Sequence, residues 1–395
     1  KSVLLFAARF PSTDLKKQLV GKLLFQQFTD KIFLPDFPDL FFRPACLINL
    51  PGSFFSASSA TVGIPHDGTA YSVVCTKRRG FKMFHFKPEG MLLDTAANRQ
   101  SFKSLATLQE AQLTGKILES RAVVCDSEHN LIVDMGSYRG IIPREEGALG
   151  IAEGTTRDIA IISRVNKPVC YRITGFSRSE NGAVVPRLSR RQVQQDCLEQ
   201  YISRLVPGDV IDGRVTHLES FGCFVDIGCG LPSLIPIDAI SISRISHPRD
   251  RFRPSQEIKA VVRAVEPGGR VSLSHKELLG TWEENAALFH AGETVAGVVR
   301  SIEDYGVFVE LTPNLAGLAE PREGIAVGQH ASVYIKSLIP EKMKAKLIIV
   351  DAFDASYHTA PSPYFISEGH ISRWRYSPAC SDRVIESVFS DPAGT

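Results

Sequence analysis

The sequence predicts an all-β chain of tandem five-stranded barrels joined by short helices. The segment Phe221–Gly228 returns as Tyr305–Thr312, and the glycine-containing entries Pro207–Gly213 and Ala291–Gly297 share the same offset of 84 residues. A constant offset between separated landmarks indicates a repeated domain. Short strand-like runs with glycine at sharp bends fill each unit. In a unit of about 70 residues this pattern favours a closed barrel, which removes exposed sheet edges.

Composition and charge set limits on function. The chain has 395 residues, of which 44% are hydrophobic and 22% charged, as in ordinary globular proteins. No apolar run approaches the ~18 residues that span a membrane, so we expect no membrane association. The eight cysteines form no Cys-x-x-Cys pair, so we expect reduced thiols in a cytoplasmic protein with no metal and no cofactor.

Positive charge is concentrated near the N-terminus. Residues 1–90 hold 12 Lys and Arg against 6 Asp and Glu, whereas the rest of the chain holds 33 against 37. Nucleic-acid binding by the repeated units would therefore need a local basic face.

Residues 1–90 differ from the rest of the chain in composition as well. They hold 13 of the 23 Phe, and a sequence typical of a globular protein follows directly after Met91. One hypothesis is read-through upstream of a start codon at Met91; the other is a small domain with a helix near Asp14–Phe28. In both cases we expect this segment to be poorly ordered.

The remaining chain divides into units by its turn signals. We expect units at 108–190, 206–275 and 291–351, followed by a linker and C-terminal appendage over 352–395. Asn181-Gly182 supplies a hairpin turn, and Ser189 caps a helix over Arg190–Leu205. A second helix is expected over Lys276–Leu288, and a short helical appendage over Gly369–Pro378 and Asp382–Phe389. The strands expected in the first unit are Leu113–Ser120, Leu131–Met135, Tyr138–Ile142, Val169–Phe176 and Ala183–Leu188.

The repeated segment places aromatic residues at fixed positions. Strand alternation puts Phe224 and Val225 on opposite faces, and Val225 with Ile227 suits the barrel interior. Phe224 then lies outside, next to Phe221 at the start of the strand. Such a pair can stack successive unpaired bases, at ~1–3 kcal/mol per base. The alternative is that both rings only cap the barrel core; the recurrence as Tyr305 and Phe308 favours the stacking role.

These units resemble S1-type RNA-binding domains, a branch of the OB-fold. The matching segments are Gly208–Thr216, Phe221–Gly228 and Gly269–Ser274 in the second unit, and Gly292–Val298, Asp304–Glu310 and Lys344–Leu347 in the third. The first unit matches more loosely, through Leu113–Ile117 and Ile132–Gly136. The whole arrangement is similar to the compact S1-like ribosomal proteins of Firmicutes-type bacteria.

The resemblance implies particular RNA-binding residues. Family members bind RNA with two aromatics, a His, an acid and a base on one face. The matching residues are Phe221, Phe224, Glu266 and Arg270 in the second unit, and Tyr305, Phe308 and Lys344 in the third. The His position holds Pro236 in the second unit and Glu320 in the third, where a carboxylate would repel phosphate. The first unit has His129 and Ile132 at the aromatic positions and Pro143 at the His position, so we expect a docking or structural module.

Local charge favours the second unit as the main RNA contact. Between Arg244 and Arg270 there are seven Lys and Arg against three acids. We expect Arg249, Arg251, Arg253 and the aromatic Phe252 in an exposed loop, a mixture that suits single strands. The alternative is a solvated loop with unrelated charges.

The resulting interpretation is a non-enzymatic, monomeric protein that binds single-stranded RNA. The resemblance implies a role at the small ribosomal subunit, presenting mRNA, or as a related translation factor. We find no phosphate-binding glycine loop and no carboxylate pair suited to catalysis, so no catalytic residue is expected. Two alternatives stay open, an RNA-processing component associated with a ribonuclease and a protein-interaction scaffold.

Overall fold

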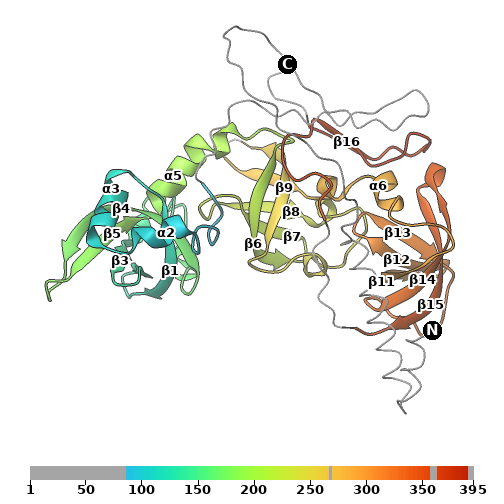
Figure 1. Ribbon diagram of the computed structural model, residues 1–395, viewed down its shortest axis with the longest axis horizontal. Coiled ribbons are helices and arrows are strands. Elements are labelled where there is room, and N and C mark those ends of the chain that lie inside the picture. The colour runs from blue at the N-terminus through green and yellow to red at the C-terminus, as the bar shows by residue number, and fades with distance from the viewer. Residues whose placement is uncertain (1–85, 267–268, 356–362, 390–395) are drawn as a thin grey trace, which may run out of the picture. The chain divides into compact units, whose positions relative to one another are not determined.

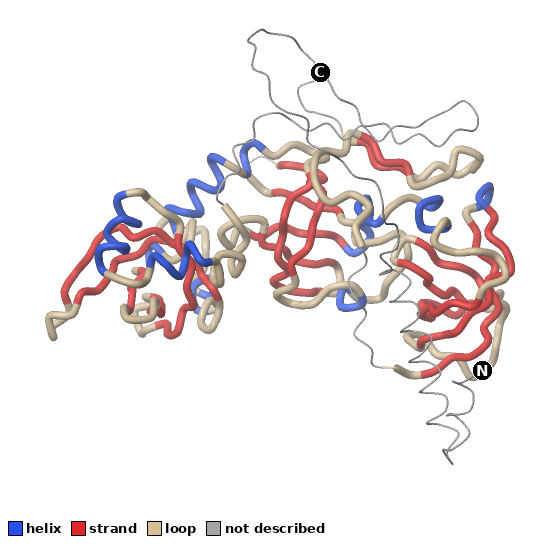
Figure 2. The backbone as a smooth tube through the Cα atoms, viewed as in Figure 1, coloured by secondary structure: helices blue, strands red, loops and turns tan. Residues whose placement is uncertain are grey.

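The computed structural model describes residues 86–266, 269–355 and 363–389. These residues form two compact units, a two-barrel unit (residues 86–280, 363–376 and 385–389) and a single-barrel unit (residues 281–355 and 377–384). The described chain contains three closed five-stranded barrels, which confirms the predicted fold class (Figures 1 and 2). The hypotheses about residues 1–90 concern a segment of which residues 1–85 lie outside the described residues.

The first barrel has the strand order β1-β2-β3-β5-β4. Its strands are β1 (Leu118–Cys125), β2 (Leu131–Asp134), β3 (Arg139–Ile142), β4 (Pro168–Arg178) and β5 (Val184–Ser189), and its helices are α2 (Ala96–Ser101), α3 (Leu105–Leu113), the 3-10 turn η2 (Arg144–Glu146) and α4 (Ile159–Ile162).

The strand expected over Leu113–Ser120 is wrong in its first half. Leu113 is the last residue of α3, which begins with a capping box between Ser104 and Thr107. Gly115, at a φ of 62°, follows the end of the helix. The strand starts at Leu118, so the apolar residues before it belong to a helical pattern that the sequence reasoning did not recognise.

The second barrel has the strand order β10-β8-β7-β6-β9. A helix, α5 (Arg191–Gln200), and a 3-10 turn, η3 (Ile202–Arg204), precede it where a single helix was expected. Its strands are β6 (Val210–Glu219), β7 (Gly222–Asp226), β8 (Pro232–Pro236), β9 (Glu257–Val265) and β10 (Val271–Ser274), with 3-10 turns η4 (Ile237–Ala239) and η5 (Pro248–Asp250) between β8 and β9.

The third barrel has the strand order β11-β12-β13-β15-β14 and forms most of the single-barrel unit. Its strands are β11 (Thr294–Glu303), β12 (Gly306–Thr312), β13 (Leu315–Ala319), β14 (His330–Ile339) and β15 (Lys344–Phe353), with the 3-10 turn η7 (Pro340–Lys342). The helix expected over Lys276–Leu288 is two short ones, η6 (Lys276–Leu279) and α6 (Trp282–Ala286). Gly280 interrupts it at a φ of 81°, and Thr281 begins a new capping box with Glu284.

The barrel interiors follow strand alternation. Val225 and Ile227 are buried, as predicted, and so are Val309 and Leu311 at the corresponding positions of the third barrel. Because side chains alternate between the two faces of a strand, the residues between these positions point away from the core. Burial of the inner set therefore fixes which side chains are left for the outer surface.

The C-terminal segment forms strands where a helical appendage was expected. Strand β16 (Arg373–Arg375) pairs with β17 (Glu386–Val388) in a two-stranded sheet. The preceding residues attach to the second barrel: His370 contacts Asp209 at 2.9 Å (Nδ1 to Oδ1), and the Tyr364 hydroxyl accepts a hydrogen bond from the Lys259 backbone N–H at 3.1 Å. Tyr364 thus packs on the second barrel, although a linker was expected in the first part of 352–395.

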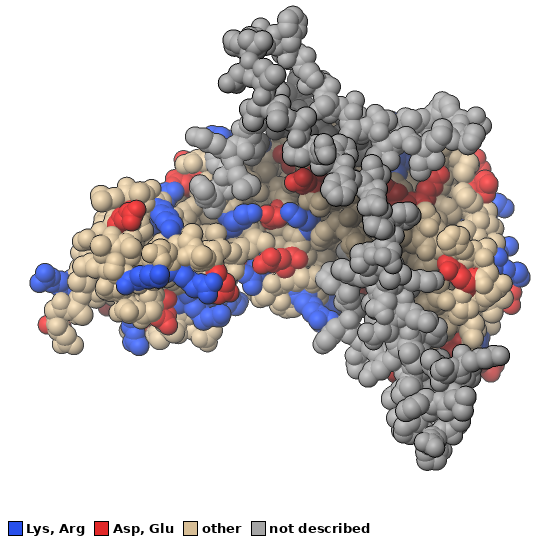
Figure 3. All heavy atoms as spheres, in the orientation of Figure 1, with Lys and Arg blue, Asp and Glu red and all other residues tan. Residues whose placement is uncertain are grey.

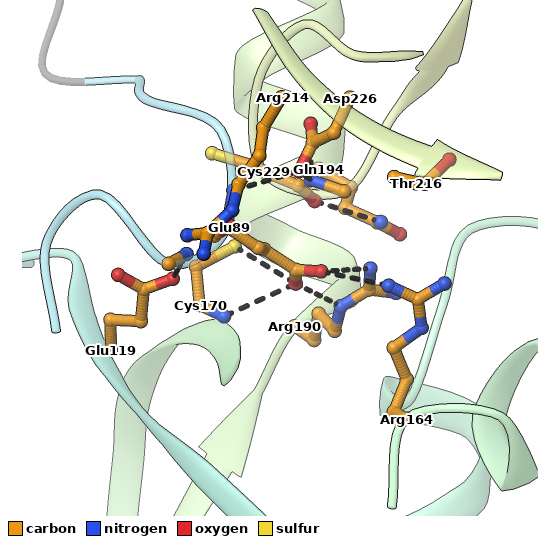
Figure 4. Close-up of polar contacts among 12 residues, drawn as sticks. Glu89, Glu119, Arg164, Cys170, Arg190, Gln194, Arg214, Thr216, Asp226 and Cys229 are labelled. Carbon is orange, nitrogen blue, oxygen red and sulfur yellow. Dashed lines mark hydrogen bonds and ion pairs between the residues drawn. The ribbon is translucent and has the colours of Figure 1, made fainter. Parts of the chain in front are cut away.

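The first two barrels are joined through a buried carboxylate, Glu89, which is 5% exposed (Figure 4). Its oxygens accept hydrogen bonds from Arg190 (Nε, 2.6 Å), Arg164 (Nη1, 3.2 Å) and the Cys170 backbone N–H (3.2 Å). Its own N–H donates to Asp226 Oδ2 at 2.7 Å. Burial would raise the pKa of Glu89, but the charges of Arg190 and Arg164 outweigh burial and hold it below its ordinary value.

The residues around Glu89 extend the same junction. The N–H groups of Gly90 and Leu92 donate to the Glu119 carboxylate in the first barrel, and the Lys87 carbonyl accepts from the Cys229 N–H in the second. The expected boundary after residue 90 therefore falls inside a segment that holds the two barrels together. Residues 86–90 belong to the folded part of the chain.

We expect a chain that begins at Met91 to be less stable than one that begins at Met83. The shorter chain lacks Glu89 and leaves Arg190 buried without its carboxylate, which costs about 3–5 kcal/mol. Urea unfolding of the two otherwise identical chains measures the difference. Equal midpoints would show that the segment before Met91 contributes nothing to the junction.

Glu119 should make the stability of the two-barrel unit depend on pH. Burial raises the pKa of Glu119 to about 7, above its ordinary value of 4.5. The folded state then binds a proton that the unfolded state releases, so stability is lost as the pH rises from 4.5 to 7. Relative to the Glu119→Gln variant, the free energy of unfolding of the wild type should fall by about 3 kcal/mol over this range. Urea unfolding at several pH values checks the slope, with the exposed Glu110→Gln as control; parallel curves for wild type and Glu119→Gln would contradict the assignment.

Candidate nucleic-acid interface

The two aromatic rings of the second barrel lie at its surface. Phe221, in the turn before β7, is 54% exposed, and Phe224 on β7 is half-buried. Their ring centroids are 6.0 Å apart and their planes meet at 89°. The predicted position of both rings outside the barrel is therefore confirmed. The edge-to-face contact supports the Phe224 ring while the Phe221 ring stays open to solvent.

The third barrel repeats this arrangement. Tyr305 is 67% exposed and Phe308 half-buried, with ring centroids 6.1 Å apart and an interplanar angle of 89°. The repeat thus preserves the relative orientation of the rings as well as their spacing in sequence.

Strand register aligns further side chains with the pair. In the second barrel, Phe224 pairs with His217 on β6 and Leu234 on β8, and Leu234 pairs with Ser272 on β10. In the third barrel the corresponding row is Ser301, Phe308, Leu318 and Lys346. A β-bulge precedes His217 and Ser301 alike. The sequence reasoning missed this row, although strand alternation combined with the 84-residue offset could have found it.

Gly222 lies between the two rings because a side chain would not fit there. A Cβ atom on Gly222 would lie 2.5 Å from the Ile235 carbonyl oxygen, and one on Gly306 would lie 2.5 Å from the Ala319 carbonyl oxygen. Both oxygens belong to the neighbouring strand. The aromatic-Gly-x-aromatic spacing therefore reflects close strand contact at the point where the outer face begins.

The acidic residue that ends the motif is buried and does not reach the stacking surface. Asp226 accepts backbone hydrogen bonds from Glu89, Gly228 and Gly230, and burial next to Glu89 raises its pKa to about 7. In the third barrel, Glu310 contacts Arg300 at 2.9 Å and 3.2 Å. The motif's acid stabilises the barrel in both repeats, a role that the sequence reasoning did not assign.

The predicted basic residues lie at one end of the same outer face. Arg270 is exposed two residues before Ser272, and Lys344 is exposed two residues before Lys346. Strand alternation places each pair on one face. Glu266 is also exposed, and its N–H donates to the Arg270 carbonyl at 2.8 Å across the β9–β10 turn.

The loop between β8 and β9 only partly matches expectation. Arg249 and Arg253 are exposed and Arg251 is half-buried. Phe252, expected in an exposed loop, is 3% exposed and packs edge-on against His275 with ring centroids 4.9 Å apart. Burial lowers the pKa of His275 to about 4, so this ring is a neutral packing group at neutral pH. The apolar ring is part of the hydrophobic core, whereas Arg249 and Arg253 remain exposed.

The first barrel presents an aliphatic face at the corresponding row. Ile132 pairs with Val124 on β1 and Ile141 on β3, and Ile141 pairs with Arg187 on β5. His129 has a φ of 64°, and its Nδ1 lies 3.8 Å from Asp158 Oδ2, so its ring faces a carboxylate and not a second ring. Pro143 precedes the 3-10 turn η2. The first barrel therefore has no aromatic pair at this position.

Two residues of this chain stand where the family has a His, and both lie at the ends of corresponding strands. Pro236 ends β8 and pairs with Gly222, and Glu320 is exposed directly after β13. Among the described residues, no group of three or more His, Cys, Asp or Glu could hold a metal ion. No helix in the described part of the chain is long and apolar enough to cross a membrane.

Comparisons with known proteins identify the second barrel. Residues 205–276 match the S1 RNA binding domain, so this barrel belongs to that family. The chain is 28% identical over 261 residues to the small ribosomal subunit protein bS1 of Staphylococcus aureus strain COL, covering 62% of this chain and 64% of that protein, less than two thirds of its length. A bS1 homolog of Bacillus cereus is 28% identical over 267 residues, covering 64% and 67% of the two chains.

A solved structure is also similar to this chain. It is a multidomain protein with nucleic acid binding domains from Streptococcus pneumoniae, 14% identical, covering 62% of this chain and 75% of that one at a TM-score of 0.21.

Substitution of Gly222 should destabilise the second barrel. Gly222→Ala forces the new methyl group toward the Ile235 carbonyl, a clash of the kind that costs about 1–3 kcal/mol. Gly175→Ala, in the first barrel, meets no atom within 4 Å and serves as the matched control. Thermal unfolding of both variants checks the difference, and similar midpoints would show that the strand contact tolerates a side chain.

Proposed function

We propose that this chain binds single-stranded RNA by stacking unpaired bases on two aromatic pairs, Phe221 with Phe224 and Tyr305 with Phe308. The observation that carries the proposal is the recurrence of an exposed ring beside a half-buried one, at 6.0 Å and 6.1 Å and the same angle, in two barrels. Exposed aromatic rings have no stabilising role in a barrel core. They supply a flat apolar surface that accepts any base, which suits binding without sequence preference.

The charged residues around each pair would hold the phosphate backbone. Arg270 and Lys344 lie at one end of the outer faces that carry the pairs, and Arg249 and Arg253 are exposed in the loop after β8. Arginine contacts phosphate through two N–H groups and also stacks on bases. Glu320 would weaken the third barrel because its carboxylate repels phosphate. We therefore assign the main contact to the second barrel.

Two linked binding sites would raise the overall affinity. Once an RNA strand occupies one barrel, the second binding event becomes intramolecular and depends on the effective concentration of the other site. This gain requires an RNA long enough to reach both aromatic pairs.

The names of the relatives support a cellular role in translation. The S. aureus and B. cereus proteins are named as small ribosomal subunit proteins. We propose that this chain likewise acts in translation in the cytoplasm, as a monomer that associates with the small ribosomal subunit and presents unstructured mRNA. The RNA is bound and released unchanged, so the protein is not an enzyme in this proposal.

We expect Phe221→Ala with Phe224→Ala to weaken binding of an unstructured RNA oligomer by roughly tenfold or more for each lost base stack. Fluorescence anisotropy at several salt concentrations measures the loss. The log–log salt slope, about −0.7 per phosphate contact, should stay nearly unchanged because no cation is removed. Phe221→Tyr, which keeps a ring, is the matched control and should bind like wild type.

Two outcomes would contradict the proposal. A folded double alanine variant with wild-type affinity would remove the stacking mechanism and favour a protein-interaction scaffold. Loss of RNA that tracks the purified protein, in the same reactions with added magnesium or manganese, would favour a ribonuclease-associated function. RNA that stays intact and bound supports the proposal.

A further inference from the structure

We propose that the RNA strand stacked on the second barrel continues across the junction onto the first barrel, where Lys167 and Arg121, with Arg164 beside them, contact its phosphates. This inference rests on the proposed function and extends it. The first barrel would then contribute electrostatic contacts to RNA binding even though it has no aromatic pair.

The outer row of the second barrel leads to this junction. The row that contains Phe224 ends on β6 at His217, whose side chain is exposed. Val215, on the same strand, is buried in the barrel interior. A strand of RNA that follows the row past Phe224 therefore reaches β6 and the surface beyond it.

The first barrel presents basic side chains at that point. Partial burial and the charges of Lys167 and Arg164 lower the pKa of the His217 imidazole. Arg164 Nη1 lies 3.2 Å from Glu89 Oε2, and the Glu89 N–H donates to Asp226, two residues after Phe224 on β7. The close-up of the junction shows Arg164 and Arg190 pointing toward the Glu89 carboxylate (Figure 4).

The loop that carries these cations is fixed in place. The Asn166 N–H donates to the Ala122 carbonyl at 2.8 Å, the Ala122 N–H donates to the Lys167 carbonyl at 3.0 Å, and Arg121 Nη1 donates to the Asn166 carbonyl at 2.8 Å. Arg164 is bound to Glu89, which in turn is bound to Asp226 of the second barrel. The loop therefore holds a defined position beside the second barrel.

The charge balance at this place favours an anion. Lys167 and Arg121 are exposed, and the Glu89 carboxylate is buried against Arg190. Glu219, exposed two residues after His217, is the opposing carboxylate whose charge acts on His217. Figure 3 shows a patch of Lys and Arg side chains on the visible face of the first barrel. A phosphate backbone is the polyanion that already lies along the neighbouring row in the proposed function.

The length of the bound RNA gives the test. Binding sites on OB folds span about 4–16 nucleotides, so a 5-nucleotide oligomer can occupy the aromatic pair alone, whereas a 16-nucleotide oligomer can also reach the junction. Lys167→Glu should weaken binding of the long oligomer roughly three- to tenfold and reduce its salt slope by about 0.7. Binding of the short oligomer should stay within twofold of wild type. Adding Arg121→Glu should increase the loss for the long oligomer.

Arg178→Glu is the matched control. Arg178 is exposed at the far end of β4, the strand that begins directly after Lys167, so the charge change is the same but its position differs. It should leave both oligomers unaffected. Three outcomes would each overturn the inference. Lys167→Glu and Arg178→Glu could reduce RNA affinity equally, or Lys167→Glu could reduce affinity for the short and long oligomers equally. The third outcome is a folded Lys167→Glu variant with unchanged affinity.

The same assay separates this inference from the proposed function. If wild type binds neither oligomer, or if Phe221→Ala with Phe224→Ala has no effect on either, the stacking function itself fails. If that double variant loses affinity and Lys167→Glu does not, only the extension onto the first barrel fails.

Discussion

Closure of each barrel is the constraint on which the remaining features depend. A five-stranded barrel of this size must fill its interior with every second side chain, so Val225, Ile227 and their counterparts in the third barrel point inward. Phe224 and Phe308, each one residue before a buried valine, face away from the barrel interior. Gly222 and Gly306 allow the next strand to approach at the point where the outer face begins. The aromatic pairs are thus left at the surface by the same alternation that builds the core.

A second level of organisation comes from buried charge. Glu89 joins Arg190 and Arg164 and, through Asp226, ties the first barrel to the second. Charged groups are costly to bury unless they are paired and hydrogen-bonded. The network meets this requirement with side chains drawn from segments that lie far apart in the sequence. It also holds the loop that carries Lys167 beside the second barrel, because Arg164 of that loop pairs with Glu89.

Some predictions were wrong for physical reasons that concern tertiary context. Phe252 was expected outside because arginines surround it, yet it is buried against His275. The residues before Leu118 were expected in a strand, yet Leu113 ends a helix that a capping box begins. The C-terminal residues form paired strands because strand partners such as Trp374 and Ser387, thirteen positions apart, become neighbours only in the folded chain. Local pattern cannot show where the core has space or which distant segment supplies a partner.

The sequence by itself determined the repeated barrel, its inward and outward positions and the aromatic residues Phe221, Phe224, Tyr305 and Phe308. These follow from the 84-residue offset and from an alternation of period two, both of which are local properties of the chain. Only the tertiary structure decided that Asp226 and Glu310 are buried, that Glu89 joins two barrels, and that Arg164 pairs with Glu89 at their junction. Such facts depend on contacts between residues that are distant in sequence, and no periodic pattern encodes them.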